Sequence, residues 1–348
     1  MLGFLANNIE QLDLALEHIV KGDVNNARFG LMLADNAVEI TLHQMALDQK
    51  ALLKNYAHLR ENFPHVEALD AALGRDFAAK LSLARLLNKV TDAEKESFGK
   101  LHAVRNEVYH IGVRHEATLP GLARFYFHLA CDVLGRYEPL WVSWSSRQKM
   151  PERAAKYLTK SLSQKAEYAQ ACVSLSTACN FDKADLISLL ATHMTDVIEQ
   201  CDRSLDFIAD VRPQKIAREH LLGDLQAWHL IFSKASNPAV KQFARKHNLA
   251  AKSANEVFDF FAKNYPFPVR GDPIRSWRRR GERLRRVPDP HKALKWYFDF
   301  MSETADVRAL LEEDHRQADL YVDGQIERAQ FEKAMARETS NPKAGLHS

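Results

Sequence analysis

Apolar residues recur at helical spacing through the first 145 residues, and this periodicity constrains the fold more than any other feature of the chain. In the opening segment they return every three or four positions, as on one face of an α-helix, at Leu2, Leu5, Ile9, Leu12, Leu16 and Ile19. The 348-residue sequence contains only 13 glycines and 12 prolines, so it offers little of the turn chemistry that a many-stranded sheet requires. We therefore predict an all-α fold.

The periodic stretches predict an N-terminal antiparallel bundle over residues 1–145. Gly22 ends the first helix, and Thr91 with Glu94 forms a capping box at the start of a later one. After the first helix, we expect helices over 24–60, 66–89, 92–111 and 120–142.

A chain of this length can form two domains, each with its own core. The polar stretch 143–152 is the expected boundary, so residues 146–348 form a second helical domain. Helices are expected there over 153–179, 183–210, 214–233, 238–248, 253–263, 291–320 and 323–338.

The cysteines and the apolar stretches predict a cytoplasmic protein that does not enter a membrane. The four cysteines form no Cys-x-x-Cys pair and no Cys/His array with zinc spacing, so free thiols in a reducing compartment are expected. Residues 1–20 lack the basic start and continuous apolar stretch of a signal peptide. The most apolar later stretch, residues 120–144, is no candidate membrane span, because it carries Arg124, His128, Asp132 and Arg136.

The stretch LHAVRNEVYHIGVRHE, residues 101–116, holds the residues that are best suited to chemistry. On a helix, Asn106 and His110 differ by only about 40° around the axis, and His102 lies on the same stripe. Arg105 lies about 140° from His110, so the two side chains cannot meet on one straight helix. They could converge on one phosphate if two copies of this helix faced each other across a dimer axis.

These residue types suit the cleavage of RNA. An imidazole titrates at about pH 6.5, so it can take the proton of a ribose 2′-hydroxyl or protonate a leaving oxygen. A guanidinium supplies fixed charge and planar donors to the oxygens of a phosphorane. The Asn106 amide can orient the imidazole or the phosphate. Because the nucleophile belongs to the substrate, this chemistry needs no metal and no cofactor.

The segment RNEVYH, residues 105–110, resembles the R-x4-6-H signature of the HEPN superfamily, in which a polar residue, commonly Asn, follows the Arg. The preceding helical pattern is also similar to the layout of that family over about residues 1–145, including LMLADNAVEITLHQM at 31–45. The resemblance implies a metal-independent endoribonuclease that acts as a homodimer. It implies catalytic roles for Arg105 and His110 and a supporting role for Asn106.

Many HEPN proteins are toxins or antiphage effectors, so the resemblance also implies an antitoxin or another regulatory partner. In the branch that is paired with a nucleotidyltransferase antitoxin, a Tyr stands two residues after the His. Here Gly112 occupies that position. Regulation by modification of that Tyr is therefore not implied, and Tyr109 does not replace it.

Each candidate residue also has a plain structural interpretation. Arg105 and His110 could be a surface pair at a helix end, where a histidine interacts favourably with the helix dipole. His102 and Tyr109 are auxiliary candidates, for catalysis and for base stacking, but a helix-surface, interface or packing role fits them as well. On that interpretation the chain is a non-catalytic dimerisation or adaptor protein, which is the alternative to an enzyme.

No metal site is predicted. His110, His115 and Glu116 match no standard helical His pair, and a solvated loop accounts for the last two.

Positive charge is concentrated in RGDPIRSWRRRGERLRR, residues 270–286, where eight arginines face only Asp272 and Glu282 in a chain of net charge +3. Such a segment suits the phosphate backbone of a nucleic acid, and the interleaved Trp suits base stacking. A solvated loop or a docking site for an acidic partner is the alternative. The predicted RNA-binding residues are Arg275, Trp277, Arg278, Arg279, Arg280, Arg283, Arg285 and Arg286.

Overall fold

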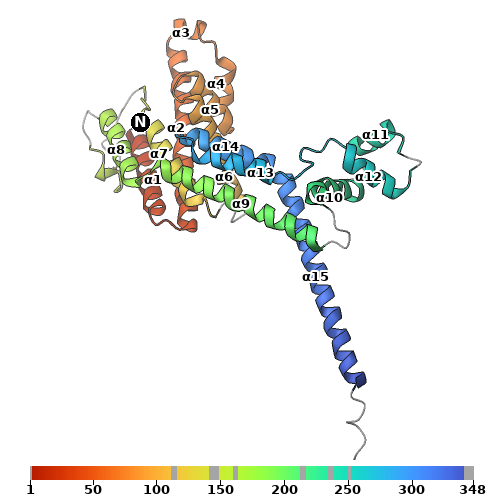
Figure 1. Cartoon of the computed structure of the whole chain (residues 1–348). Helices are drawn as coiled ribbons and strands as arrows, with labels where there is room; N and C mark the ends of the chain where they lie inside the picture. The colour runs from red at the N-terminus through yellow and green to blue at the C-terminus, as the bar shows by residue number, and fades with distance from the viewer. Residues whose placement is uncertain are drawn as a thin grey trace, which may run out of the picture. The chain divides into compact units, whose positions relative to one another are not determined.

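The chain is all-helical in the computed structural model (Figure 1), which describes residues 2–110, 116–140, 149–159, 164–211, 217–233, 238–249 and 252–340. Over these residues the regular elements are fifteen α-helices and one short 3-10 helix, without any strand. The all-α fold that the apolar periodicity predicts is therefore confirmed.

The chain forms two compact units, each defined by its internal contacts. Unit 1 contains Met1–His193 and Arg283–Asp299, and unit 2 contains Met194–Glu282 and Phe300–Ser348. The expected boundary at 143–152 falls for the most part outside the described residues. Helix α8 (Gln164–Cys179), which the sequence analysis assigned to the second domain, packs on α1 (Leu2–Ile19) and α7 (Leu119–Gly135) in unit 1.

Unit 1 is built around α2 (Val24–Asn55), which packs against α1, α7, α5 (Phe77–Leu86) and α6 (Asp92–His110). Helices α1 and α2 approach closely at Gly30, because a Cβ at that position would overlap the Ile19 side chain. The apolar face of α7 fills the centre of the bundle with Phe125, Tyr126 and Phe127, all buried. Unit 1 also contains α3 (Ala57–Glu61), α4 (Val66–Ala72) and η1 (Ala154–Lys156).

The single helix expected over 66–89 is wrong, since the structure has two helices there, α4 and α5. The chain turns at Gly74 and restarts at Asp76, whose side-chain Oδ1 accepts from the backbone N–H of Ala78 at 2.9 Å. An Asp at this position stabilises a new helix start. The break places Arg75 and Asp76 beside α6, where the candidate site lies.

The capping box at the start of α6 is present as expected. The Thr91 Oγ1 accepts from the backbone N–H of Glu94 at 3.2 Å, and the Glu94 carboxylate accepts from the backbone N–H of Thr91 at 2.7 Å. This reciprocal pair satisfies two backbone donors at the helix start. It fixes where α6 begins, and hence which of its residues face α2.

Unit 2 contains α10 (Arg218–Ser233), α11 (Pro238–Lys246) and α12 (Ala254–Asn264), which pack around Phe261 and Val240. Arg218 joins α10 to neighbouring segments through ion pairs with Asp202, Asp206 and Asp272. Helices α9 (Lys183–Val211), α13 (Ile274–Arg285) and α14 (Pro290–Glu303) each contain residues of both units.

The last two helices divide at Thr304, whereas the sequence placed their division near residue 321. Helix α15 (Ala305–Ser340) continues through Gly324 without interruption. A glycine inside a helix costs only about 1 kcal/mol, so it does not by itself end the element.

Among the described residues, no helix combines the length and the apolar character that a membrane crossing requires.

Candidate functional site

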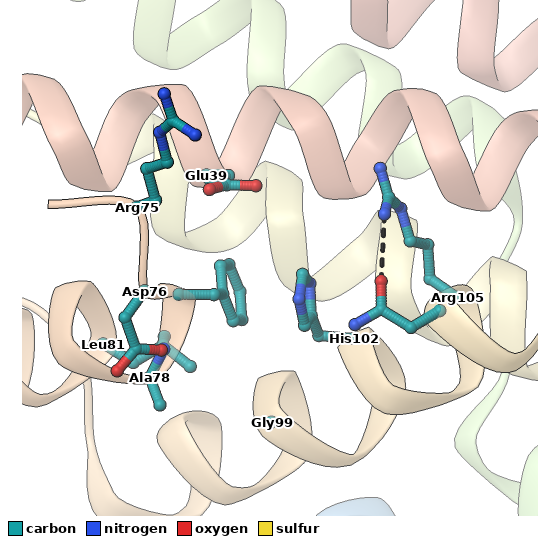
Figure 2. A pocket seen from close by; sticks show the side chains of 10 residues that line it. Glu39, Arg75, Asp76, Ala78, Leu81, Gly99, His102 and Arg105 are labelled. Atoms are coloured by element: carbon teal, nitrogen blue, oxygen red, sulfur yellow. Dashed lines mark hydrogen bonds between the residues drawn. The ribbon is translucent and has the colours of Figure 1, made fainter. Parts of the chain in front are cut away.

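A cavity of about 500 Å³ opens between α2, α5 and α6 in unit 1. Its volume is in the range typical of ligand-binding clefts, about 300–1,000 Å³. Figure 2 shows Arg105 and His102 on one side of the cavity and Glu39 with Arg75 on another. The lining residues are Glu39, Arg75, Asp76, Phe77, Ala78, Leu81, Gly99, His102, Arg105 and Asn106.

Helix α6 brings three of the sequence-predicted site residues to this cavity, namely His102, Arg105 and Asn106. Residues three and four apart lie on one face of a helix, so Arg105 and Asn106 follow His102 along the same wall. The chain therefore places an imidazole, a guanidinium and a carboxamide within little more than one turn of helix.

A buried carboxylate on α2, that of Asp35, lies behind this wall, with a side chain that is 0% exposed. Its Oδ1 accepts from the Tyr126 hydroxyl at 2.7 Å. The His102 Nδ1 lies 2.9 Å from the same oxygen and 3.1 Å from Oδ2. Burial, with the adjacent charge of Asp35, raises the pKa of Tyr126 well above its ordinary value. Tyr126 therefore stays protonated and donates to Asp35.

The His102 imidazole is held on two sides. Its Nδ1 faces Asp35, and its ring stacks on Phe77 with centroids 4.0 Å apart and planes 11° from parallel. Its other nitrogen, Nε2, has no hydrogen-bond partner among the residues that the structure describes. With 19% of its side chain exposed, His102 presents a fixed ring edge to the cavity.

The Arg105 guanidinium is partly engaged. Its Nη1 donates to the Asn106 Oδ1 at 2.9 Å (Figure 2), and its Cζ lies 5.5 Å from the centre of the Tyr109 ring. Its Nε is 3.3 Å from the Asp35 Oδ2, an ion-pair distance, but the alignment is too poor for a hydrogen bond and leaves Nε without an acceptor. Arg105 therefore keeps donors that could serve an anion in the cavity.

Glu39 and Arg75 form the wall opposite α6. Lys80, with only 5% of its side chain exposed, donates to the Glu39 Oε1 at 2.7 Å and also to the backbone oxygen of Arg75. The Arg75 guanidinium has no ion-pair partner among the described residues. The charged lining residues are Arg75 and Arg105 with Glu39 and Asp76, and Lys80 neutralises Glu39. The two guanidiniums offer donors to an anion.

His110 is the last residue of α6, but its side chain and the following residues 111–115 lie outside the described part of the chain. Its predicted catalytic role therefore stays a prediction, as does the loop interpretation of His115. The last turn of α6 is tied to α2, since the Arg28 Nη2 donates to the backbone oxygen of Val108 at 3.0 Å. Tyr109 is 61% exposed on this turn.

The described residues contain no group of three His, Cys, Asp or Glu side chains placed to hold a metal ion. The four cysteines are free and buried.

The Arg-rich segment forms helix α13, so the sequence prediction that the interleaved Trp stacks on a base is wrong. Trp277 is only 4% exposed and packs edge-on against Phe300 with ring centroids 5.6 Å apart. The helix is amphipathic: Ile274, Trp277 and Leu284 are buried, while the arginines between them project outward. An indole in this position stabilises unit 2 and is not available to a base.

Three of the seven predicted RNA-binding arginines already have partners. In unit 2, Arg278 donates to Glu199 and Asp202, and Arg280 donates to Glu303. In unit 1, Arg283 lies over the Trp296 ring at 5.2 Å. Among the described residues the remaining four have no side-chain partner and are exposed, namely Arg275 and Arg279 in unit 2 and Arg285 and Arg286 in unit 1.

Sequence reasoning missed Asp35, Phe77 and Arg75. A signal for Asp35 exists, because it stands between Leu31, Ala34 and Val38 on the apolar stripe of α2, where a carboxylate is costly unless it is paired. The positions of Phe77 and Arg75 depend on the break between α4 and α5, which the apolar spacing did not reveal.

Comparisons with protein-family models, with curated proteins and with solved structures each found no match for this chain.

Proposed function

We propose that the chain is a metal-independent endoribonuclease whose catalytic residues are Arg105, Asn106 and His110. One observation carries the proposal: Arg105 and Asn106 lie hydrogen-bonded to each other in a cavity of about 500 Å³ that a second arginine, Arg75, also lines. A phosphate in this cavity would find a guanidinium with unused donors and an amide beside it. Charge-assisted donors of this kind are the groups that stabilise a phosphorane.

In the proposed reaction, the ribose 2′-oxygen attacks the adjacent phosphorus, and the bond from phosphorus to the 5′-oxygen breaks. Arg105 stabilises the charge that develops on the equatorial oxygens, and Asn106 orients the phosphate through its amide nitrogen. His110 transfers a proton. The products are a 2′,3′-cyclic phosphate and a 5′-hydroxyl end. Arg75, on the opposite wall, binds a neighbouring phosphate of the strand.

The proposal includes a homodimer, because the angular offset between Arg105 and His110 on one helix makes a single copy a poor site. Two copies of α6 that faced each other would bring the Arg105 of one to the His110 of the other. By the resemblance to HEPN proteins, the biological role that we propose is that of a toxin or antiphage effector. Such a role requires an antitoxin or another regulatory partner.

The test is cleavage of end-labelled RNA by purified protein in EDTA. Wild-type protein is expected to cleave and to leave a 2′,3′-cyclic phosphate, whereas His110→Ala protein is expected to be inactive. A 2′-deoxy substitution at the scissile nucleotide should block cleavage, because it removes the nucleophile. His128→Gln is the matched control, since His128 also lies in unit 1 but its Nδ1 contacts Ser176 away from the cavity.

Strict dependence on magnesium or manganese would overturn the mechanism. Self-association without cleavage of any RNA would favour the adaptor alternative.

A further inference from the structure

We propose that His102 is a second acid–base catalytic residue of this site and that Asp35 is its positioning residue. The inference rests on the proposed ribonuclease function and deepens it. It assigns a proton-transfer role to a side chain inside the cavity, whereas the motif alone points to His110.

The chemistry calls for two proton transfers. The 2′-hydroxyl must lose a proton as its oxygen bonds to phosphorus, and the leaving 5′-oxygen must gain one as its bond to phosphorus breaks. Two separate groups can perform these steps in one turnover, one as base and one as acid. Of the other groups that line the cavity, Glu39 is paired with Lys80 and Asp76 caps α5, whereas His102 presents an imidazole that can serve as the second proton-transfer group.

The Asp35 contact determines which nitrogen of His102 can act. A carboxylate accepts hydrogen bonds, so the Nδ1 that lies 2.9 Å from its Oδ1 carries the proton. The lone pair is then on Nε2, which has no partner among the described residues. An Asp that holds an imidazole in one tautomer and stabilises the imidazolium is a recurrent means of making histidine a better base.

Asp35 is itself held in place from two other helices. Tyr126 on α7 donates to Oδ1 at 2.7 Å, and Arg105 on α6 supplies positive charge at 3.3 Å from Oδ2. A carboxylate that is 0% exposed would be strongly unfavourable without such partners. The Phe77 ring, stacked at 4.0 Å, prevents the imidazole from rotating away.

The proposed step balances as follows. The His102 Nε2 takes the proton of the 2′-hydroxyl while the 2′-oxygen bonds to phosphorus. The bond from phosphorus to the 5′-oxygen breaks with its electron pair on oxygen, and the imidazolium of His110 from the second copy of the chain protonates that oxygen. Exchange with water then returns both imidazoles to their starting states.

Several charged groups line or support this part of the site and would contribute to its pH dependence. Asp35 and Glu39 come from α2, Lys80 from α5 and Arg105 from α6. Asp76, Arg75 and Tyr126 complete the set. Of these, Asp35 alone is hydrogen-bonded to the imidazole, so its removal is the most direct perturbation.

The experiment measures the single-turnover rate of RNA cleavage against pH for wild-type, His102→Gln and Asp35→Asn proteins. We expect His102→Gln to lower the maximal rate by at least about 10²-fold, the usual effect of losing a general base. It should also abolish the acidic limb of the pH profile. Asp35→Asn should lower the rate and move that limb toward lower pH, because the protonated imidazole loses its buried counter-charge. His128→Gln should change neither quantity.

Added imidazole separates catalysis from structure. His102→Gly opens space for a free imidazole molecule, so millimolar imidazole should restore part of the lost rate in this variant and have no effect on His128→Gly. Circular dichroism and urea unfolding identify any variant that fails to fold. His102→Gln then carries the test if Asp35→Asn does not fold.

The outcomes distinguish this inference from the proposed function. A His102→Gln protein with wild-type rate and pH profile, alongside inactive Arg105→Ala and His110→Ala proteins, would overturn the inference and leave the ribonuclease intact. A slow His102→Gln protein with an unchanged pH profile, together with no imidazole rescue of His102→Gly, would also overturn it. If wild-type protein cleaves no RNA, the proposed function fails and the inference fails with it.

Discussion

The guanidinium of Arg105 donates through Nη1 to the Oδ1 of Asn106, the next residue in the chain, at 2.9 Å. Successive residues of a helix are about 100° apart, so this contact bends the arginine sideways along the wall of the cavity. It also fixes the Asn106 amide, whose oxygen is engaged and whose nitrogen has no partner among the described residues. The pair therefore acts as one donor surface, and its two members should differ in how much each contributes.

Replacing Arg105 should affect turnover more than replacing Asn106. We expect Arg105→Ala to lower kcat by about 10²–10³-fold, the range for losing one donor to a developing oxyanion. Asn106→Ala should lower kcat by a smaller factor, because the Asn106 amide orients the phosphate and carries no charge. Arg105→Lys should recover only part of the loss, since an ammonium lacks the planar fork. Single-turnover RNA cleavage measures all three, and equal rates for wild-type and Arg105→Ala would contradict the assignment.

The Tyr126 hydroxyl should stabilise both the fold and the site. Tyr126→Phe removes a 2.7 Å hydrogen bond to the buried Asp35, so the free energy of unfolding should fall by about 1.5–3 kcal/mol, as for hydrogen bonds to charged groups. Tyr137→Phe is the matched control, because the Tyr137 hydroxyl donates to Asp48 at 2.6 Å outside the cavity. Urea unfolding should show a similar loss for both, while RNA cleavage should fall only in Tyr126→Phe. A cleavage loss in both would mean that stability alone is responsible.

The buried thiols should be unreactive and should make the fold sensitive to alkali. Burial raises the pKa of Cys172 to about 12 and that of Cys179 to about 11, from an ordinary 9.0. Unfolded thiols ionise first as pH rises, so this contribution to stability is complete below pH 9.0 and is lost as pH increases toward 11 and 12. The urea midpoint should therefore fall above pH 9, and fall less in Cys172→Ala. Ellman's reagent at pH 8 should label four thiols only after unfolding, and rapid labelling of native protein would contradict this.

The unpaired arginines of α13 should bind RNA phosphates if this helix contacts the substrate. Arg275 and Arg279 are four residues apart on one exposed face in unit 2. Replacing both with Gln should weaken RNA binding and reduce the slope of log affinity against log salt by about 1.4 units, at about 0.7 per contact on a single strand. The rate at saturating RNA should be nearly unchanged.

Arg278→Gln is the informative control for that experiment. Its guanidinium pairs with Glu199 and Asp202. Arg278→Gln should therefore lower the free energy of unfolding and leave the salt slope nearly unchanged. An unchanged slope in the Arg275 and Arg279 double variant would assign the helix to a protein partner or to solvent.

Local sequence patterns predicted the parts of the site that depend on one helix. The Thr91 capping box determined the start of α6, and helical spacing placed His102, Arg105 and Asn106 along one wall. These features depend only on backbone geometry within about four turns, which the order of residues specifies directly.

Features that depend on two helices were not predictable in the same way. Asp35 and His102 are 67 positions apart, and their contact requires the packing of α2 against α6. The break at Gly74, which positions Arg75, was hidden for a different reason. The apolar spacing is helical both before and after it, so it predicts one continuous helix. Trp277 was misassigned because it was grouped with the arginines beside it in the sequence. The arginines lie on the exposed face of α13, whereas the indole lies on its buried face.

The bond from Arg28 to the Val108 carbonyl oxygen spans 3.0 Å and holds the final turn of α6, the turn that ends at His110. Carbonyls in the last turn of a helix lack intrahelical partners, so Arg28 supplies a donor that the helix itself cannot. If the proposed motif is catalytic, only molecules in which this turn is formed, or closed, would have it complete, and turnover would scale with their population. Losing a charge-assisted hydrogen bond of about 1.5–3 kcal/mol would reduce the ratio of closed to open turns by roughly ten- to a hundredfold. A ligand or side chain that bound Arg28 in place of the Val108 carbonyl would thereby lower the turnover rate without altering the proposed catalytic residues.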